Sequence, residues 1–144
     1  MNGQAMHEGD KVTMNGMEWE VISVYTRKQA IADGVLVDLT RLFPNDTRIY
    51  KYPVACTMAV WQMIEDACHK VETEEHTEVS LAEAGGIVWD LCWMSTRAIV
   101  KDLGNERLFK CCVPIGTKER LFKVHIGPGD DYSPVITIML PDED

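Results

Sequence analysis

Hydrophobic and polar residues alternate near the start of the chain, on both sides of Asn15-Gly16. Residues 11–14 and 17–21 each place apolar side chains at every second position, which is the period of a strand with one buried face. Asn-Gly is the preferred pair for the two-residue turn of a β-hairpin, because both positions need a positive φ. The pattern predicts an N-terminal hairpin.

A short helix and a strand are predicted next. Thr26 and Gln29 have the spacing of a capping box, in which each side chain binds the backbone N–H of the other residue. Gly34 suits the left-handed position just after a helix, so the helix ends there. The apolar run of residues 35–39, rich in β-branched side chains, then predicts a strand.

Two stretches are polar enough to be read as loops. Residues 41–51 contain Pro44-Asn45-Asp46, a sequence typical of turns. Residues 72–79 include the run Glu-Thr-Glu-Glu-His-Thr-Glu, which is too polar to bury and predicts a mobile acidic loop.

Two further helices are predicted in the middle of the chain. After Pro53, apolar residues recur at the period of one helix face: Val60, Trp61, Ile64, Ala67, Cys68 and Val71. A third helix is expected to start at Ile87 or Asp90, because Gly85-Gly86 interrupts any earlier start, and to reach Leu103. It is apolar nearly all round, as a central helix would be.

A hairpin is predicted from residues 107–115 and 120–126, with its turn centred on Thr117-Lys118. This register pairs Cys111 with Val124. One face then carries Phe109, Cys111, Val113, Ile115, Phe122, Val124 and Ile126, and the other carries Lys110, Cys112, Lys123 and His125. A shift by one residue would exchange the two faces.

The final strand is expected within residues 135–140, which are apolar on both faces and therefore typical of an interior strand. Residues 127–131, Gly-Pro-Gly-Asp-Asp, form a tight loop before it. The predicted hairpin register also brings Cys112 diagonally close to His125.

The order of these elements favours an α+β fold over a doubly wound α/β fold. We expect an N-terminal β-hairpin, about three helices, and C-terminal antiparallel strands packed on the helices, with a hairpin and a central final strand. The 144 residues fit one domain, 1–144, in which the hairpin of residues 1–22 can be peripheral.

Composition adds a charge argument. The formal net charge is −9, from 23 acidic and 14 basic side chains. Because an acidic surface repels phosphate backbones, nucleic acid is not an expected direct partner. The charge either keeps the protein soluble or forms a negative face that docks a basic protein partner.

The five cysteines match no zinc or redox spacing, and we expect no metal and no cofactor. No apolar run approaches the roughly 18 residues of a membrane span. We therefore expect a cytoplasmic protein with reduced thiols, in which Cys68 and Cys92 are buried.

Catalytic motifs do not stand out. Neither a Gly-rich phosphate loop nor a nucleophile elbow occurs. Cys112 beside His125 would still need a third orienting group and an oxyanion site, so we name no catalytic residue and lean against an enzyme. Asp130 and Asp131 alone fall short of the oxygen ligands that Ca²⁺ prefers.

Four sequence blocks appear in an order that resembles a known but uncharacterised family of small proteins from bacteria, phages and plasmids. They are Tyr25-Thr26-Arg27-x-x-Ala30-x-x-Asp33-Gly34-Val35-Leu36-Val37-Asp38, Pro53-Val54-Ala55-x-Thr57-x-Ala59-Val60-Trp61, Trp89-Asp90-x-x-Trp93-Met94, and Gly127-Pro128-Gly129-Asp130. The resemblance covers residues 21–140 and is weaker in the N-terminal hairpin. It implies an accessory role, such as interference with host defence, and no specific activity.

Two functions remain open at this point. The leading hypothesis is a non-enzymatic interaction or inhibitory protein that presents acidic residues to a basic partner. The alternative is a ligand-binding protein or enzyme with a pocket between residues 25–38 and 127–131. Candidate binding residues are Tyr25, Arg27, Asp33, Asp38, Asp130 and Asp131. A homodimer is a third possibility.

Overall fold

The computed structural model describes residues 11–14, 17–20, 25–68, 70–72, 77–79, 81–114 and 116–143. Its helices are α1 (Arg27–Ala32), α2 (Leu39–Leu42), α3 (Met58–Ala67) and α4 (Leu81–Arg97). Its strands are β1 (Lys11–Met14), β2 (Met17–Glu20), β3 (Leu36–Asp38), β4 (Val54–Thr57), β5 (Lys70–Glu72), β6 (Thr77–Val79), β7 (Ile99–Asp102), β8 (Glu106–Cys112), β9 (Glu119–Pro128) and β10 (Pro134–Met139). The predicted α+β class is confirmed.

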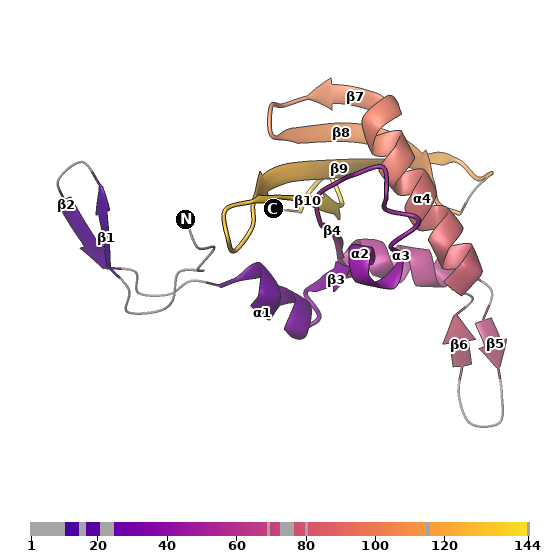
Figure 1. Cartoon of the computed structure of the whole chain (residues 1–144). Coiled ribbons are helices and arrows are strands. Elements are labelled where there is room, and N and C mark those ends of the chain that lie inside the picture. Colours follow the sequence, from indigo (N-terminus) through magenta and orange to yellow (C-terminus); the bar gives the residue numbers. More distant parts are fainter. Residues whose placement is uncertain are drawn as a thin grey trace.

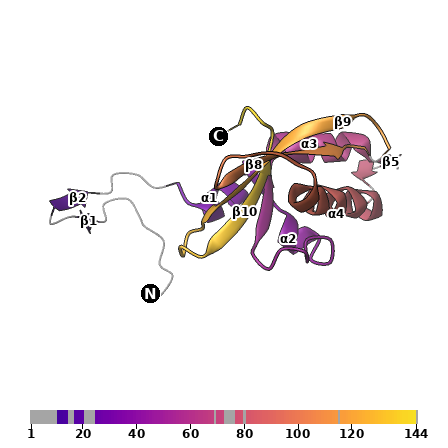
Figure 2. The same ribbon diagram turned by 90° about the horizontal axis from the view of Figure 1, so that it is seen from above.

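Six strands form one mixed sheet in the order β3-β4-β10-β9-β8-β7. β10 runs parallel to β4, and every other neighbouring pair is antiparallel. The predicted interior position of the last strand is therefore confirmed. α3 and α4 lie together on one face of this sheet (Figures 1 and 2). The other described strands form two hairpins, β1–β2 and β5–β6.

The hydrophobic core fills the space between the helices and the sheet. Its largest fully buried side chains are Phe109, Phe122, Leu39, Ile64, Leu91, Ile136, Ile138, Val54, Val60, Val88, Val124 and Cys56. The strand residues among them occupy alternate positions, so the residues between them point to the other side of the sheet. We call that other side the open face.

One row of residues crosses the open face. The strand register places Asp38 of β3, Ala55 of β4, Thr137 of β10, His125 of β9 and Glu106 of β8 side by side. Neighbours in such a row have their Cβ atoms only about 4.5–5.5 Å apart. Side chains from five strands therefore lie in one row across the sheet.

The expectations for the first half of the chain are largely confirmed. β1 and β2 pair as an antiparallel hairpin on either side of residues 15–16, which lie outside the described residues. The α1 capping box is present, with Thr26 Oγ1 accepting from Gln29 N at 3.0 Å and Gln29 Oε1 accepting from Thr26 N at 2.9 Å. Gly34 follows the helix with a φ of +77°.

Residues 39–57 contain two elements that the pattern did not predict. α2 begins within the expected strand, because the Asp38 carboxylate accepts from Arg41 N at 3.1 Å and caps a helix there. β4 precedes α3 directly and is buried along its whole length. A short apolar run of this kind cannot be assigned to strand or helix by periodicity alone.

The predicted third helix was wrong at both ends, because α4 spans Leu81–Arg97. It continues through Gly85 and Gly86, and at Gly85 a Cβ would come within 2.6 Å of Asp46 Oδ2. Gly85 therefore allows close packing of the 43–47 loop rather than ending the helix. Beyond Arg97, β-branched Ile99 and Val100 belong to strand β7, which pairs with β8.

The predicted turn at residues 117–118 was also wrong. β8 ends at Cys112, β9 begins at Glu119, and these two residues are paired, so the connection is longer than a two-residue turn. The observed register pairs Cys111 with Arg120 instead of Val124, a shift of four residues. An even shift leaves both faces unchanged, so the predicted core residues Phe109, Cys111, Val113, Phe122 and Val124 are buried, and Ile126 is half-buried against the same core. Ile115 lies outside the described residues.

Two predictions are only partly correct: the apolar face of α3 and the acidic loop of residues 72–79. Val60, Ile64 and Cys68 are buried as expected, but Val71 belongs to β5 rather than to the helix. The acidic stretch is not a loop throughout, because Glu72 of β5 pairs with Thr77 of β6. Residues 73–76 lie outside the described residues.

All five thiols are free, with Cys56, Cys68, Cys92 and Cys111 buried and Cys112 half-buried. The predicted burial of Cys68 and Cys92 is confirmed. Among the described residues, no helix combines the length and hydrophobicity that a membrane crossing requires.

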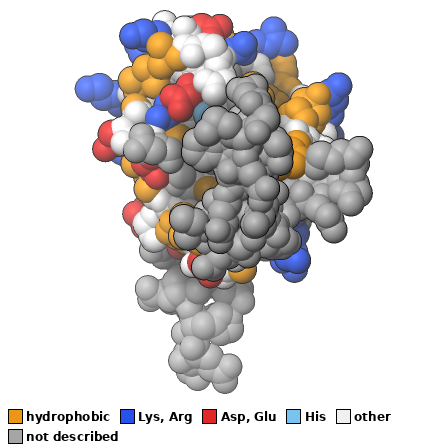
Figure 3. Space-filling model, turned by 90° about the vertical axis from the view of Figure 1, so that its left-hand side faces the viewer, with side chains coloured by type: hydrophobic (Ala, Val, Ile, Leu, Met, Phe, Trp, Pro, Cys, Tyr) orange, Lys and Arg blue, Asp and Glu red, His pale blue; other side chains and the backbone are white. Residues whose placement is uncertain are grey.

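The acidic residues are distributed unevenly. Segments 1–24 and 69–80 contain Glu8, Asp10, Glu18, Glu20, Glu72, Glu74, Glu75 and Glu78 against only Lys11 and Lys70. The rest of the chain is much closer to charge balance, and the face in Figure 3 shows side chains of both signs. The net charge therefore does not describe the surface around the six-stranded sheet.

Candidate functional site

The Asp130 carboxylate joins the loop after β9 to the N-terminus of α1. Its Oδ1 accepts from Arg27 N at 2.7 Å, and its Oδ2 accepts from Lys28 N at 3.0 Å. The first N–H groups of a helix have no partner inside the helix, and an anion there is also favoured by the helix dipole. Asp130 therefore acts as a cap supplied from a distant part of the chain.

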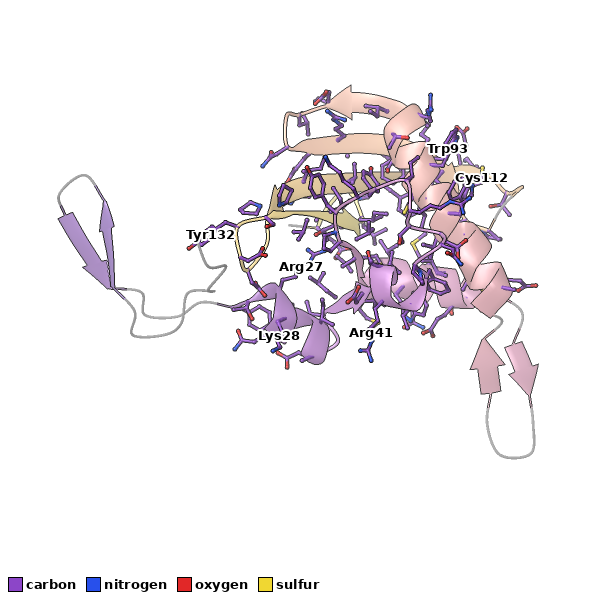
Figure 4. All side chains as sticks on the ribbon, in the orientation of Figure 1. Arg27, Lys28, Arg41, Trp93, Cys112 and Tyr132 are labelled. Atoms are coloured by element: carbon purple, nitrogen blue, oxygen red, sulfur yellow. The ribbon has the colours of Figure 1, made fainter. Side chains whose placement is uncertain are left out.

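The Arg27 side chain fixes α1 to the sheet from the same position. Its Nη1 donates to Thr137 Oγ1 at 2.8 Å, and its Nη2 donates to the carbonyl oxygen of Ile136 at 2.8 Å. Burial lowers the pKa of Arg27, while the negative charges of Asp38 and Asp130 oppose that shift. Figure 4 shows Arg27 between α1 and the sheet. We call the bonds of Arg27 and Asp130 together the α1 clamp.

The remaining predicted site residues also have local partners. Tyr25 donates its hydroxyl hydrogen to Asp33 Oδ2 at 2.7 Å on the exposed surface, and this hydrogen bond raises the pKa of Tyr25. Asp38 caps α2, as described above. Asp131 Oδ1 accepts from Ser133 N at 3.0 Å within the loop before β10.

A small cavity of 360 Å³ lies where the sequence predicted a pocket, between α1, β3 and the β9–β10 loop. Four of the six predicted residues line it: Arg27, Asp38, Asp130 and Asp131. Tyr25 and Asp33 do not line it. Arg27 and Asp130 therefore meet at this cavity, and Asp33 does not line it. The polar atoms that meet there are largely engaged by the α1 clamp.

A larger cavity of 640 Å³ lies on the open face and was not predicted. Its wall is formed by Gly34, Val35, Leu36, Thr57, Met58, Ala59, Glu106, His125, Thr137, Met139 and Glu143. We call it the open-face cavity. The wall combines apolar side chains from the β3 region, the start of α3 and the end of β10 with polar side chains from β8, β9 and the C-terminal segment.

Glu143 is held in a defined orientation at this cavity. Its Oε1 accepts from Thr57 Oγ1 at 2.8 Å and from Leu140 N at 3.0 Å. Lys123, which is only 7 % exposed, donates from Nζ to the backbone carbonyl oxygen of Glu143. The same Nζ lies 3.8 Å from Glu106 Oε2. A buried lysine thus connects the two carboxylate residues of the wall.

His125 stands opposite Glu106 in the strand register and opposite Thr137 on its other side. Its ring lies over Gly127, where an added Cβ would be 2.6 Å from Cε1. The predicted diagonal proximity of Cys112 to His125 is wrong, because Cys112 pairs with Glu119 at the other end of β9. Figure 4 shows Cys112 beside α4, far from Arg27.

The sequence contained part of the signal for this cavity. The alternation in β9 placed Lys123 and His125 on the polar face, but the wrong register paired them with the wrong residues of β8. Glu106 lay just before the predicted strand of residues 107–115, and Glu143 lies beyond the predicted final strand. No group of three or more potential metal ligands occurs within the described part of the chain.

The fold and site define an α+β protein with a ligand-sized cavity on the open face of its sheet. The chain belongs to a family of unknown function (DUF6573), whose model matches residues 14–144. The match begins at the end of β1, so it includes strand β2, where the sequence resemblance was weaker. Searches of curated proteins and of solved structures found no match.

Proposed function

We propose that this protein binds a small, mainly apolar ligand in the open-face cavity. The observation that carries this proposal is the cavity itself, whose 640 Å³ lies within the range of about 300–1,000 Å³ typical of ligand pockets. Such pockets combine a mostly apolar wall with a few placed polar groups. Here Val35, Leu36 and Met139 supply the apolar wall, and Glu106 and His125 supply the polar groups.

The α1 clamp supports this function indirectly. Arg27 and Asp130 hold α1 on the sheet, and α1 leads through Gly34 directly into the wall residues Val35 and Leu36. The Val35 carbonyl oxygen then accepts from Met58 N at 3.1 Å, which joins this wall to the start of α3. In this proposal, residues 25–38, which the sequence suggested as a binding site, instead support one wall of the open-face cavity.

A cavity-filling substitution tests the proposal. Ala59 is an exposed wall residue near the start of α3, so Ala59→Trp should occupy the cavity without disturbing the core. Ala82→Trp is the matched control, since Ala82 is exposed near the start of α4 and does not line the cavity. The probe is N-phenyl-1-naphthylamine, a neutral apolar fluorophore.

The wild type and Ala82→Trp should show the same saturable fluorescence increase with the probe. Ala59→Trp should weaken binding about tenfold or more, which corresponds to about 1.4 kcal/mol. Absence of saturable binding to the wild type would overturn the proposal, and so would equal binding by Ala59→Trp.

A second candidate function is docking to a basic protein, favoured by the acidic segments 1–24 and 69–80. Because surface charge pairs are screened by salt, such a complex should weaken as ionic strength rises. Replacing Glu72, Glu74, Glu75 and Glu78 by Gln should release a captured partner at low salt. Capture that is independent of salt and of these residues would contradict acidic docking.

A further inference from the structure

We infer that the ligand of the open-face cavity carries one ammonium group on an apolar body, and that Glu106 and Glu143 receive this group. The inference rests on the proposed function and adds the chemical class of the ligand. It concerns charge selectivity, which is separate from whether the cavity binds anything.

The acidic side chains in the cavity wall are Glu106 and Glu143. Lys123 does not line the cavity, and its ammonium donates to the Glu143 carbonyl oxygen and lies 3.8 Å from Glu106 Oε2. The Arg27 guanidinium is likewise engaged by Thr137 and Ile136. Lys123 offsets part of the charge of Glu106, but the two carboxylates outnumber this one lysine, so the wall keeps a net negative charge.

Within the described residues, hydrogen bonds reach only one oxygen of the Glu143 carboxylate. Thr57 and Leu140 both donate to Oε1, and no described residue donates a hydrogen bond to Oε2. A carboxylate held by two donors is pre-oriented, so a ligand donor meets it without further ordering of the side chain. Hydrogen bonds that involve charged groups are stronger than neutral ones, which favours an ammonium donor.

The apolar residues of the wall select the rest of the ligand. Val35, Leu36, Met58 and Met139 offer an apolar surface, and the flexible thioether side chains of methionine adapt to varied shapes. An anionic ligand of the same shape would meet Glu106 and Glu143 and lose its hydration without compensation. A neutral ligand would gain only the apolar contacts.

Three matched probes test this selectivity: 4-phenylbutylammonium, 4-phenylbutanol and 4-phenylbutanoate, each titrated into the full chain by calorimetry at pH 7. They share one apolar body and differ in the charge of the terminal group. We expect the ammonium to bind about tenfold tighter than the alcohol and the carboxylate to bind weakest. The double variant Glu106→Gln, Glu143→Gln should remove the preference for the ammonium.

The amide introduced by Glu143→Gln keeps an oxygen that can accept from Thr57 and Leu140. Glu106→Gln leaves Lys123 its hydrogen bond to the Glu143 carbonyl oxygen, so the double variant should fold, which circular dichroism checks. Glu119→Gln is the control, because Glu119 is exposed and does not line the cavity. It should keep the wild-type order of affinities.

Equal affinities for the three probes, or a preference for the carboxylate, would overturn the ammonium class and leave the binding function standing. If none of the three probes binds while N-phenyl-1-naphthylamine still does, the ammonium class is also overturned and the binding function stands. Failure of that neutral fluorophore as well would overturn the proposed function itself. A preference that survives the double variant would show that other groups receive the ammonium and would overturn the assignment to Glu106 and Glu143.

Discussion

The carboxylate of Asp130 accepts a hydrogen bond from the backbone N–H of Arg27 across 103 positions of sequence. This contact attaches the first turn of α1 to the loop that precedes the central strand β10. The guanidinium of the same arginine binds β10 itself. Residues first singled out as a binding site thus hold one wall of a neighbouring cavity.

Loss of the distant helix cap should destabilise the protein measurably. Asp130→Ala removes the acceptor of two helix N–H groups and should lower the free energy of unfolding by about 1–2 kcal/mol. Asp131→Ala removes the same charge but only one bond within a loop, and should cost less. Urea denaturation of both variants measures the difference, and equal losses would contradict the capping role.

The Arg27 side chain should matter more than an exposed arginine. Arg27→Met removes two hydrogen bonds to β10 while retaining much of the apolar stem, and we expect a loss of about 2–3 kcal/mol. Arg41→Met, at an exposed position of α2, should change stability by less than about 0.5 kcal/mol. Thermal and urea unfolding test this. If Arg27→Met is as stable as Arg41→Met, the hydrogen bonds of Arg27 do not stabilise the fold as described.

The adjacent glycines of α4 should respond to alanine by different amounts. At Gly86 nothing lies within 4 Å of an added Cβ, so Gly86→Ala should stabilise the helix by about 0.5–1 kcal/mol. At Gly85 the Cβ would approach Asp46 Oδ2 to 2.6 Å and Phe43 Cδ1 to 3.5 Å. Because the Asp46 carboxylate must shift to admit this Cβ, Gly85→Ala should stabilise the protein less than Gly86→Ala does. Calorimetric melting of both variants measures the difference, and equal stabilisation by the two changes would argue against this packing.

Stability should fall at alkaline pH because of buried thiols. Burial raises the pKa of Cys92 to about 12 from 9.0 and also raises the pKa of Cys56 and Cys111. Since these thiols ionise more readily in the unfolded chain, their contribution is complete below pH 9 and is lost as the pH rises from 9 toward 12.

Each such thiol makes the free energy of unfolding fall by about 1.4 kcal/mol per pH unit in that window. Cys92→Ala should reduce the slope by about that amount, as urea titrations between pH 8 and pH 11 would show. Val88→Ala, a core truncation in the same helix without an ionisable group, should lower stability and keep the wild-type slope. Identical slopes in the wild type and Cys92→Ala would refute the assignment.

Local signals in the sequence were reliable where local chemistry decides the structure. The capping box of Thr26 and Gln29, the left-handed Gly34 and the β1–β2 hairpin follow from the residues themselves. The buried faces of β8 and β9 were also predicted, because alternation depends only on whether the register is odd or even.

Features set by distant contacts could not be predicted in the same way. Gly85 appeared to interrupt a helix because the sequence does not show that Asp46 and Phe43 pack against it. The β8–β9 register depends on the longer connection between Cys112 and Glu119. Without that register, Glu106 could not be placed opposite His125, and the open-face cavity was missed.

The most direct test of the open-face cavity is an amide chemical-shift map of the ¹⁵N-labelled protein titrated with 4-phenylbutylammonium. The account predicts that the largest saturable changes cluster around Leu36, Thr57, His125 and Thr137, and that Ala59→Trp abolishes them. Changes centred instead on the smaller cavity around Pro53 and Gly129, or on the outer face of α4, would contradict it.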